Sequence, residues 1–242
     1  KKYRALTNQH RTLKVAKAFC EKNGNSAYFP YLNGQTWAEK LGEQIQNGQV
    51  PAMALKEAMG QIYDISPEYR SAFSETEEFD EVFGVRLTDE GVLASDTACK
   101  VSNIDALFEN MLLTKNGIFC LDYEWVFLFP VPEHFVKYRI LYYFYEQYHS
   151  VLGQLDLDSV LAMFEITPQM AEIYRKMEEN FQNYVHGENQ QLYLGNYMVY
   201  SRGIREIRQT ESDLARARER IEQMKIHSRE KDVEIRKITE VQ

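Results

Sequence analysis

The segment "VSNIDALFENMLLTKNGIFCLDYEWVF", residues 101–127, sets two carboxylates and an amide around what reads as a tight turn. Its apolar runs NMLLT and IFCLD are separated by residues 115–117, Lys-Asn-Gly. Asn and Gly accept the positive φ that a hairpin turn requires, so the pattern predicts strand, turn, strand. This hairpin would bring Asn110, at its start, close to Asp122, at its end, while Asp105 precedes Asn110 on the chain.

These three residue types supply what phosphoryl transfer from a nucleotide needs. One carboxylate can accept or orient a substrate hydroxyl, while an amide oxygen and a second carboxylate hold Mg²⁺ against the phosphates. A simpler interpretation is that Asp105 and Asn110 cap turns, as both residue types often do. Asp122 argues against it, because a carboxylate that closes an apolar run is costly unless it is paired or bound to a metal.

Upstream of this segment, the pattern alternates between helix and hairpin. Residues 1–11 read as the last turns of a helix, and a second hairpin is predicted around the Lys-Asn-Gly-Asn turn at 22–25. A helix is predicted from Thr36 to Gln46, because Thr36 and the Glu three residues later form a capping-box pattern. Another helix is expected at about Ala52–Ile62.

Downstream, the acidic, broken stretch at 66–84 reads as a surface excursion, and an aromatic helix follows Pro132. Two or three further helices are expected in 156–200. We predict that Trp125 and its neighbours Phe127, Phe129 and Pro130 pack the segment after Asp122 against these helices. Arg139 could pair with a buried carboxylate such as Glu124 or Asp122, or lie on the surface, and the sequence leaves these alternatives open.

From Ile207 onward, charged residues dominate and apolar or small residues recur in heptad register. The register positions are Ile207, Thr210, Leu214, Ala217, Ile221, Met224, Ile235 and Ile238. This pattern favours a coiled coil that joins chains or spaces domains. A lone surface helix is the alternative, because Thr, Ala, Ser and Lys weaken the seam.

Composition narrows the class of protein. The chain has 242 residues, is 44% hydrophobic and carries a net charge of −8, which indicates a globular protein and argues against nonspecific binding to nucleic acid. No apolar run reaches the roughly 18 residues of a membrane helix, and no signal peptide is evident. Three distant cysteines are expected to be buried and reduced, as in a cytoplasmic protein. The start "KKYRAL" reads as mid-helix, so we expect further domains in a longer parent chain.

A resemblance adds to this interpretation. "NIDALFEN" followed by "CLDYEW" is similar to the catalytic and metal-binding loops of protein-kinase-like enzymes, and most similar to the aminoglycoside and choline phosphotransferase group. "YFPYLNGQTWAEKL" resembles the hinge of that group. The longer match "NIDALFENMLL…LDYEWVFLFPVPEHFVKYR" resembles a kinase-like module of bacterial surface-polysaccharide proteins. Those include O-antigen chain-terminating methyltransferase-kinases and multidomain glycosyltransferases, in which a coiled coil can follow the module.

The resemblance implies a role for each matched residue. Asp105 would be the catalytic base, Asn110 and Asp122 the Mg²⁺ ligands, and Glu124 a further metal carboxylate or a residue beside it. Backbone groups at the hinge residues Phe29, Tyr31 and Leu32 would meet the adenine of ATP. The sequence departs from the kinase-like pattern in two ways. Asn103 stands where a histidine is common, two residues before the catalytic Asp. No glycine-rich loop or strand lysine precedes the hinge, unless Lys1 or Lys2 is that lysine.

The sequence therefore predicts an α+β protein-kinase-like fold with a truncated small lobe at 1–35, a mostly helical large lobe at 36–203 and a coiled-coil helix at 204–242. The function implied is ATP- and Mg²⁺-dependent phosphotransfer to a hydroxyl, on a sugar, a glycan or another acceptor, in bacterial surface-polysaccharide assembly. A cytoplasmic place at the inner membrane face, reached through partners, is expected. The alternative is a non-catalytic kinase-like scaffold in a multidomain glycosyltransferase or methyltransferase.

Overall fold

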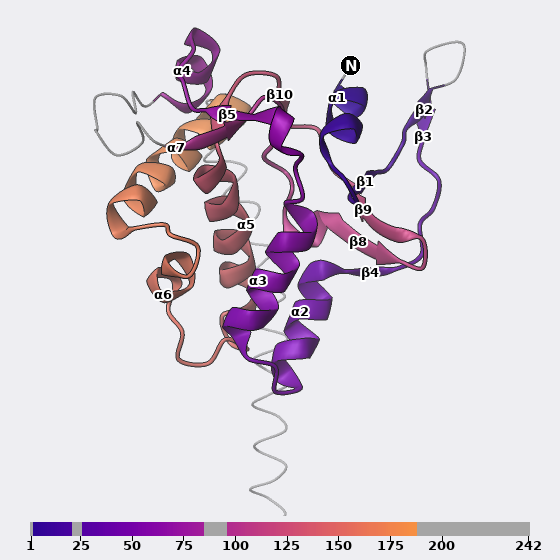
Figure 1. The fold of residues 1–242 in the computed structure, drawn as a ribbon, viewed down its shortest axis with the longest axis vertical. Coiled ribbons are helices and arrows are strands. Elements are labelled where there is room, and N and C mark those ends of the chain that lie inside the picture. The colour runs from indigo at the N-terminus through magenta and orange to yellow at the C-terminus, as the bar shows by residue number, and fades with distance from the viewer. Residues whose placement is uncertain (1, 21–25, 85–95, 188–242) are drawn as a thin grey trace, which may run out of the picture. The chain divides into compact units, whose positions relative to one another are not determined.

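A computed structural model describes residues 2–20, 26–84 and 96–187 of the chain. Contacts divide the chain after Tyr184, and the fold described here is that of the first unit, residues 1–184. It mixes helices with short strands, which confirms the predicted α+β class (Figure 1). The predicted coiled coil at 204–242 and the predicted boundary before it lie outside the described residues. None of the helices in the described ranges is long and apolar enough to cross a membrane.

A four-stranded sheet holds the segment that opened the sequence analysis. Its strands, in spatial order, are β1 (Lys14–Val15), β9 (Gly117–Cys120), β8 (Met111–Thr114) and β4 (Gln35–Thr36). β8 and β9 form an antiparallel hairpin, as predicted. β1 runs parallel to β9, and β4 runs antiparallel to β8. The sheet therefore joins the predicted small-lobe segment to the predicted large lobe.

The N-terminal elements follow the predicted order. They are α1 (Lys2–Gln9), the antiparallel pair β2 (Phe19–Cys20) and β3 (Ala27–Tyr28), α2 (Trp37–Gln46) and α3 (Pro51–Ile62). The capping box is present at α2, where the Thr36 side chain accepts from the Glu39 backbone N–H and the Glu39 side chain accepts from that of Thr36. α3 begins at Pro51, the first helical position, where a missing N–H costs nothing.

The acidic stretch at 66–84 is not a surface excursion, and that prediction was wrong. It forms a 3₁₀ turn η1 (Pro67–Tyr69), β5 (Arg70–Ala72) and α4 (Glu77–Phe83). Phe79 and Phe83 of α4 are fully buried, because rings distant in sequence, such as Phe135 and Phe181, pack on Phe83. The Glu77, Glu78 and Glu81 side chains of the same helix are exposed.

The rest of the first unit consists of helices and two further strand ladders. The remaining elements are β6 (Thr97–Cys99), β7 (Ser102–Asn103), η2 (Phe108–Asn110), β10 (Val126–Phe127), β11 (Val131–Pro132), α5 (Glu133–Tyr148), α6 (Leu157–Ala162) and α7 (Pro168–His186). α5 and α7 lie side by side (Figure 1), and Phe135 of α5 packs on Tyr174 of α7. Two antiparallel ladders, β5–β6–β11 and β7–β10, connect these helices to the loops around the hairpin.

Candidate functional site

The predicted site residues meet at the open end of the β8–β9 hairpin. Met111 pairs with Cys120, and the Leu121 N–H donates to the Asn110 carbonyl at 2.8 Å. Asp122 therefore stands one residue beyond the cross-strand neighbour of Asn110. The hairpin register brings together the amide and carboxylate that the sequence pattern paired.

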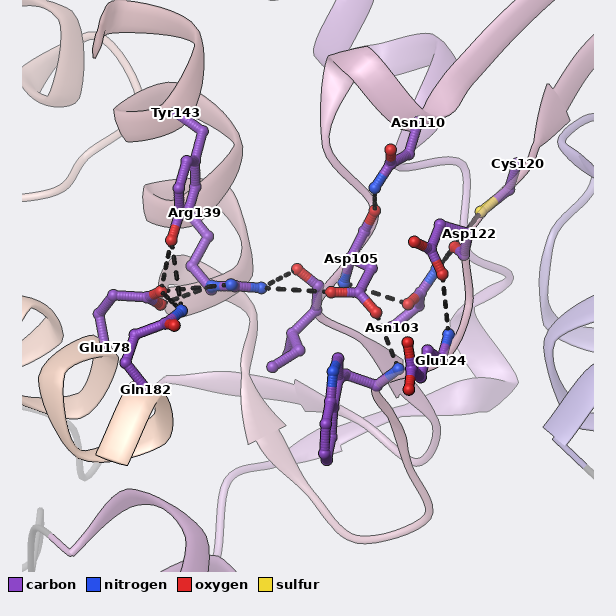
Figure 2. Close-up of polar contacts among 12 residues, drawn as sticks. Asn103, Asp105, Asn110, Cys120, Asp122, Glu124, Arg139, Tyr143, Glu178 and Gln182 are labelled. Atoms are coloured by element: carbon purple, nitrogen blue, oxygen red, sulfur yellow. Dashed lines mark hydrogen bonds and ion pairs between the residues drawn. The ribbon is translucent and has the colours of Figure 1, made fainter. Parts of the chain in front are cut away.

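Asn110 is tied directly to the loop that carries Asp105 (Figure 2). Its Nδ2 donates to the Asp105 carbonyl oxygen at 2.8 Å, and the Leu107 N–H donates to the same oxygen at 2.7 Å. This bond fixes the orientation of the Asn110 amide. The Asn110 Oδ1 accepts no hydrogen bond from the described residues, so it is available to an outside ligand.

Asn103, the departure from the kinase-like pattern, is the residue that links the two loops. Its Oδ1 accepts from the Asp105 N–H at 3.2 Å, and its Nδ2 donates to the Asp122 carbonyl at 3.1 Å. The same Nδ2 lies 3.3 Å from the Cys120 sulfur. The side chain is buried. Since both ends of the amide are engaged, Asn103 sets the spacing between Asp105 and Asp122.

The Asp105 carboxylate is largely buried, and some of its neighbours raise its pKa while others lower it. Burial raises its pKa, and the negative charges of Asp122 and Glu124 add to that rise. Two neighbours lower the pKa of Asp105. The Trp125 N–H donates to Oδ2 at 2.8 Å, and the Arg139 guanidinium lies 4.0 Å from Oδ1. A carboxyl whose pKa is raised in this way holds a proton more readily than an exposed aspartate.

Asp122 and Glu124 are exposed, in contrast to Asp105, so Asp122 does not carry the burial cost that was expected from its place after an apolar run. The Glu124 N–H donates to Asp122 Oδ1 at 3.1 Å, which closes a tight turn, and the Lys2 ammonium of α1 donates to the Glu124 carbonyl at 2.6 Å. No hydrogen bond within the described residues engages Asp122 Oδ2. The Asp122 and Glu124 side chains are therefore open to solvent on one turn, while the Asn110 side chain, at the end of the neighbouring strand, is half-buried.

This donor set fits Mg²⁺, which is commonly held by one or two carboxylates together with substrate phosphates. In the described part of the chain, no three or more His, Cys, Asp or Glu side chains cluster into a complete metal cage. A cation here would depend on the Asn110 amide, the Asp122 and Glu124 carboxylates, and oxygens from its substrate.

Arg139 pairs with a buried carboxylate, one of the alternatives left open by the sequence, but the partner is Glu178 rather than Glu124 or Asp122. It is buried, and its Nε donates to Glu178 Oε2 at 2.6 Å. Its Nη1 donates to the Ile104 carbonyl, next to Asp105. Burial works against both charges, but Arg139 lowers the pKa of Glu178, and the carboxylate in turn raises the pKa of Arg139. The buried ion pair thus holds the backbone beside the candidate base.

Glu178 was missed in the sequence, although a signal was present. It lies on the buried face of α7 among Tyr174, Met177 and Phe181, at helical spacing. Its Oε1 also accepts from the Tyr143 hydroxyl at 2.7 Å and the Gln182 amide at 2.8 Å. A glutamate on an otherwise apolar helix face, four residues before a glutamine, indicates a buried partner.

The hinge residues lie apart from this cluster. Phe29 and Tyr31 are exposed, at 58% and 91% of their full side-chain surface, and Leu32 lines a cleft that the carboxylates do not border. Residues 29–32 run between β3 and β4, and no loop hydrogen bond in the described part of the chain engages their backbone groups. Those groups are available to a ligand, but the structure does not bring them into contact with Asp105 or Asp122.

No protein-family model matches this chain, and no curated protein matches it significantly. The resemblance to kinase-like enzymes therefore rests on the motif residues and on their order along the chain.

Proposed function

We propose that this chain carries the catalytic and metal-binding loops of a kinase-like phosphotransferase. The observation that supports the proposal most directly is the nearness of Asn110 and Asp122 at the open end of the hairpin. There Asp122 follows the cross-strand neighbour of Asn110, and the Asn110 amide is bonded to the Asp105 backbone. Capping alone does not account for the Asn110 Oδ1 and Asp122 Oδ2 atoms, which no hydrogen bond within the described residues engages.

Each residue has a defined part in the proposed reaction. Asp105 accepts the proton of the acceptor hydroxyl, helped by the rise in pKa that burial causes. Asn110 and Asp122, with Glu124 beside them, hold Mg²⁺, which neutralises charge on the nucleotide phosphates. Asn103 keeps Asp105 at a fixed spacing from the metal ligands.

Arg139 offsets part of the negative charge that gathers around Asp105. Because Glu178 already engages its Nε, Arg139 stays in place whether or not Asp105 is protonated. The acceptor hydroxyl belongs to a sugar or glycan, and the setting is bacterial surface-polysaccharide assembly, both as the resemblance implies. ATP is the donor, with its adenine at residues 29–32.

A second function, in a different class, is a non-catalytic kinase-like scaffold that positions a glycosyltransferase or methyltransferase. The feature that favours it is the lack, within residues 1–242, of a glycine-rich loop to cover the phosphates. A fold can be kept after its chemistry is lost.

The deciding experiment is calorimetric titration of ATP in Mg²⁺, on the chain in its full-length natural context. The phosphotransferase proposal predicts that the affinity for ATP falls at least roughly tenfold in Asp122→Asn, because a charge-assisted contact contributes about 1.5–3 kcal/mol. Asp158→Asn, an exposed aspartate of α6, is the matched control and should bind as the wild type does. If the folded protein shows no Mg²⁺-dependent binding, the phosphotransferase is excluded and the scaffold is left.

A further inference from the structure

A small cavity lies inside the first unit, where the end of α1 meets the core. Residues from the end of α1, the end of α3, β6, the segment 101–106 and α5 border it. It leaves about 10 Å³ for the centre of a water molecule. A single water needs about that much space, so the cavity has room for one water and for no larger ligand.

The lining of this cavity is polar as well as apolar. The polar lining residues are Gln9, His10, Tyr63, Cys99, Ser102 and Asn103. The apolar ones are Ile62, Ile65, Val101, Ala106 and Val136. Cavities that stay dry are lined by apolar groups alone, whereas internal water is held where it finds two to four polar partners.

Gln9, the last residue of α1, carries an acceptor that the protein leaves unsatisfied. The residue is 1% exposed, and its Oε1 has no hydrogen-bond partner among the described residues. Its Nε2 stands 3.5 Å from the His10 Nε2. A buried acceptor without a partner loses its hydration and gains nothing in return, so a hydrogen-bond donor beside Gln9 Oε1 is favoured.

The His10 ring determines which end of the Gln9 amide is left over. Burial raises the pKa of Asp64, but hydrogen bonds from His10 and Thr12 bring it below its ordinary value, so this carboxyl is ionised. Its Oδ1 accepts the proton of His10 Nδ1 at 3.0 Å. In the neutral ring, Nε2 is then an acceptor, which suits the Gln9 NH₂ group and not its oxygen. The Gln9 Oε1 therefore remains for the cavity.

Ser102 and Tyr63 supply further polar groups to the same cavity. Ser102 is buried, and its hydroxyl donates to the Cys99 carbonyl at 3.4 Å, which leaves the Oγ lone pairs for a donor. The Tyr63 hydroxyl can donate in turn. A water that donates one hydrogen to Gln9 Oε1 and the other to Ser102 Oγ uses both of its hydrogens.

We propose that one structural water occupies this cavity and bridges Gln9 Oε1 to Ser102 Oγ. The water joins the end of α1 to β7, the strand that carries Asn103. It satisfies a buried amide that no described protein group satisfies. The water is independent of the proposed phosphotransfer, since its partners hold it with or without a nucleotide or Mg²⁺.

The direct test is a crystal structure of the chain at a resolution that shows ordered water. The proposal predicts one isolated peak of electron density in the cavity, within hydrogen-bond distance of Gln9 Oε1 and Ser102 Oγ. A cavity without density would overturn it, and so would a Gln9 amide that has turned to another protein partner. This measurement uses the unaltered protein, so it does not depend on whether a variant folds.

Magnetic relaxation dispersion of the water oxygen nucleus tests the same proposal in solution, because it counts the internal waters that exchange slowly. Gln9→Met keeps the length of the side chain and removes its acceptor, so this variant should hold one slowly exchanging water fewer. Gln46→Met, the same change at the exposed end of α2, is the matched control and should hold as many as the wild type. Equal counts for Gln9→Met and the wild type would overturn the proposal.

Discussion

The buried carboxylate of Glu178 holds the groups beside Asp105 in place. Glu178 holds Arg139, and Arg139 in turn contacts the Ile104 carbonyl and Asp105. A buried pair of this kind gains little over an apolar pair, yet removal of one partner leaves the other charge unpaired. The stability of the fold and the environment of the candidate base are therefore linked through this carboxylate.

We expect Glu178→Gln to lower the free energy of unfolding by about 3 kcal/mol at pH 7. Burial raises the pKa of Glu178, but the charge and hydrogen bond of Arg139 and the hydrogen bonds from Tyr143 and Gln182 together lower it below its ordinary value of 4.5. Its contribution is therefore complete above pH 4.5 and is lost as the pH falls through the folded-state pKa. Urea denaturation of both proteins between pH 3 and pH 7 should show the difference shrinking toward the acidic end.

Glu179→Gln is the matched control for this prediction. Glu179 is the next residue on α7, is exposed, and pairs with Arg175 on the surface. Its loss should change stability by less than about 1 kcal/mol at every pH. Equal effects of the two substitutions would show that the Glu178 pair is not energetically distinct.

Among the structural elements, β4 is held closest to its neighbour. A Cβ added at Gly34, just before β4, would lie 2.1 Å from the Leu113 carbonyl oxygen of β8. The strand pair thus depends on a residue without a side chain.

Gly34→Ala should therefore destabilise the protein by more than about 2 kcal/mol, because β4 and β8 must move apart. Gly60→Ala is the opposite case, since Gly60 lies inside α3 and a Cβ there meets nothing within 4 Å. It should stabilise by roughly 0.5–1 kcal/mol through helix propensity. Thermal unfolding of the two variants against the wild type checks both signs, and a stable Gly34→Ala protein would contradict the close approach.

α4 contributes to the core through Phe83, which contacts the rings of Phe79, Phe127, Phe135 and Phe181. We expect Phe83→Ala to lower the free energy of unfolding by about 4 kcal/mol. Leu128→Ala, at a side chain that is 43% exposed, should cost less than about 0.5 kcal/mol. Chemical denaturation would contradict the core assignment if both variants unfolded at the same denaturant concentration.

These elements show which parts of the fold could be predicted from the sequence. α2 and the β8–β9 hairpin were predicted because their signals are local, a capping box and an Asn-Gly turn. α4 was not, because its acidic residues dominate the composition while Phe83 is buried by partners more than 40 positions away.

In the candidate site too, some contacts could be predicted from the sequence and others could not. The nearness of Asn110 and Asp122 could be predicted from the sequence, since a hairpin fixes which residues lie across from each other. The contact of Arg139 with Glu178 spans two helices, and the choice among Asp122, Glu124 and Glu178 as its partner depends on how α5 packs on α7. The linking role of Asn103 depends on β7 lying beside the end of β9.

For the whole molecule, the division after Tyr184 suggests a separable first unit. We expect residues 1–187 to fold alone and to be monomeric, and the complete chain to associate through the heptad register from Ile207 onward. Light scattering of both after size-exclusion chromatography measures this directly. A monomeric complete chain would favour the lone surface helix.

The parallel pairing of β1 with β9 constrains how the protein can form. Lys14 and Phe119 are neighbours in the sheet although about a hundred residues separate them. During synthesis, Leu6 and Val15 have no core to enter until Val101 and Val126 have left the ribosome. Long-range pairings of this kind slow folding and prolong the exposure of apolar segments. The β1 segment is therefore made about a hundred residues before its sheet partner, and it is among the last of the described strands to reach its final place.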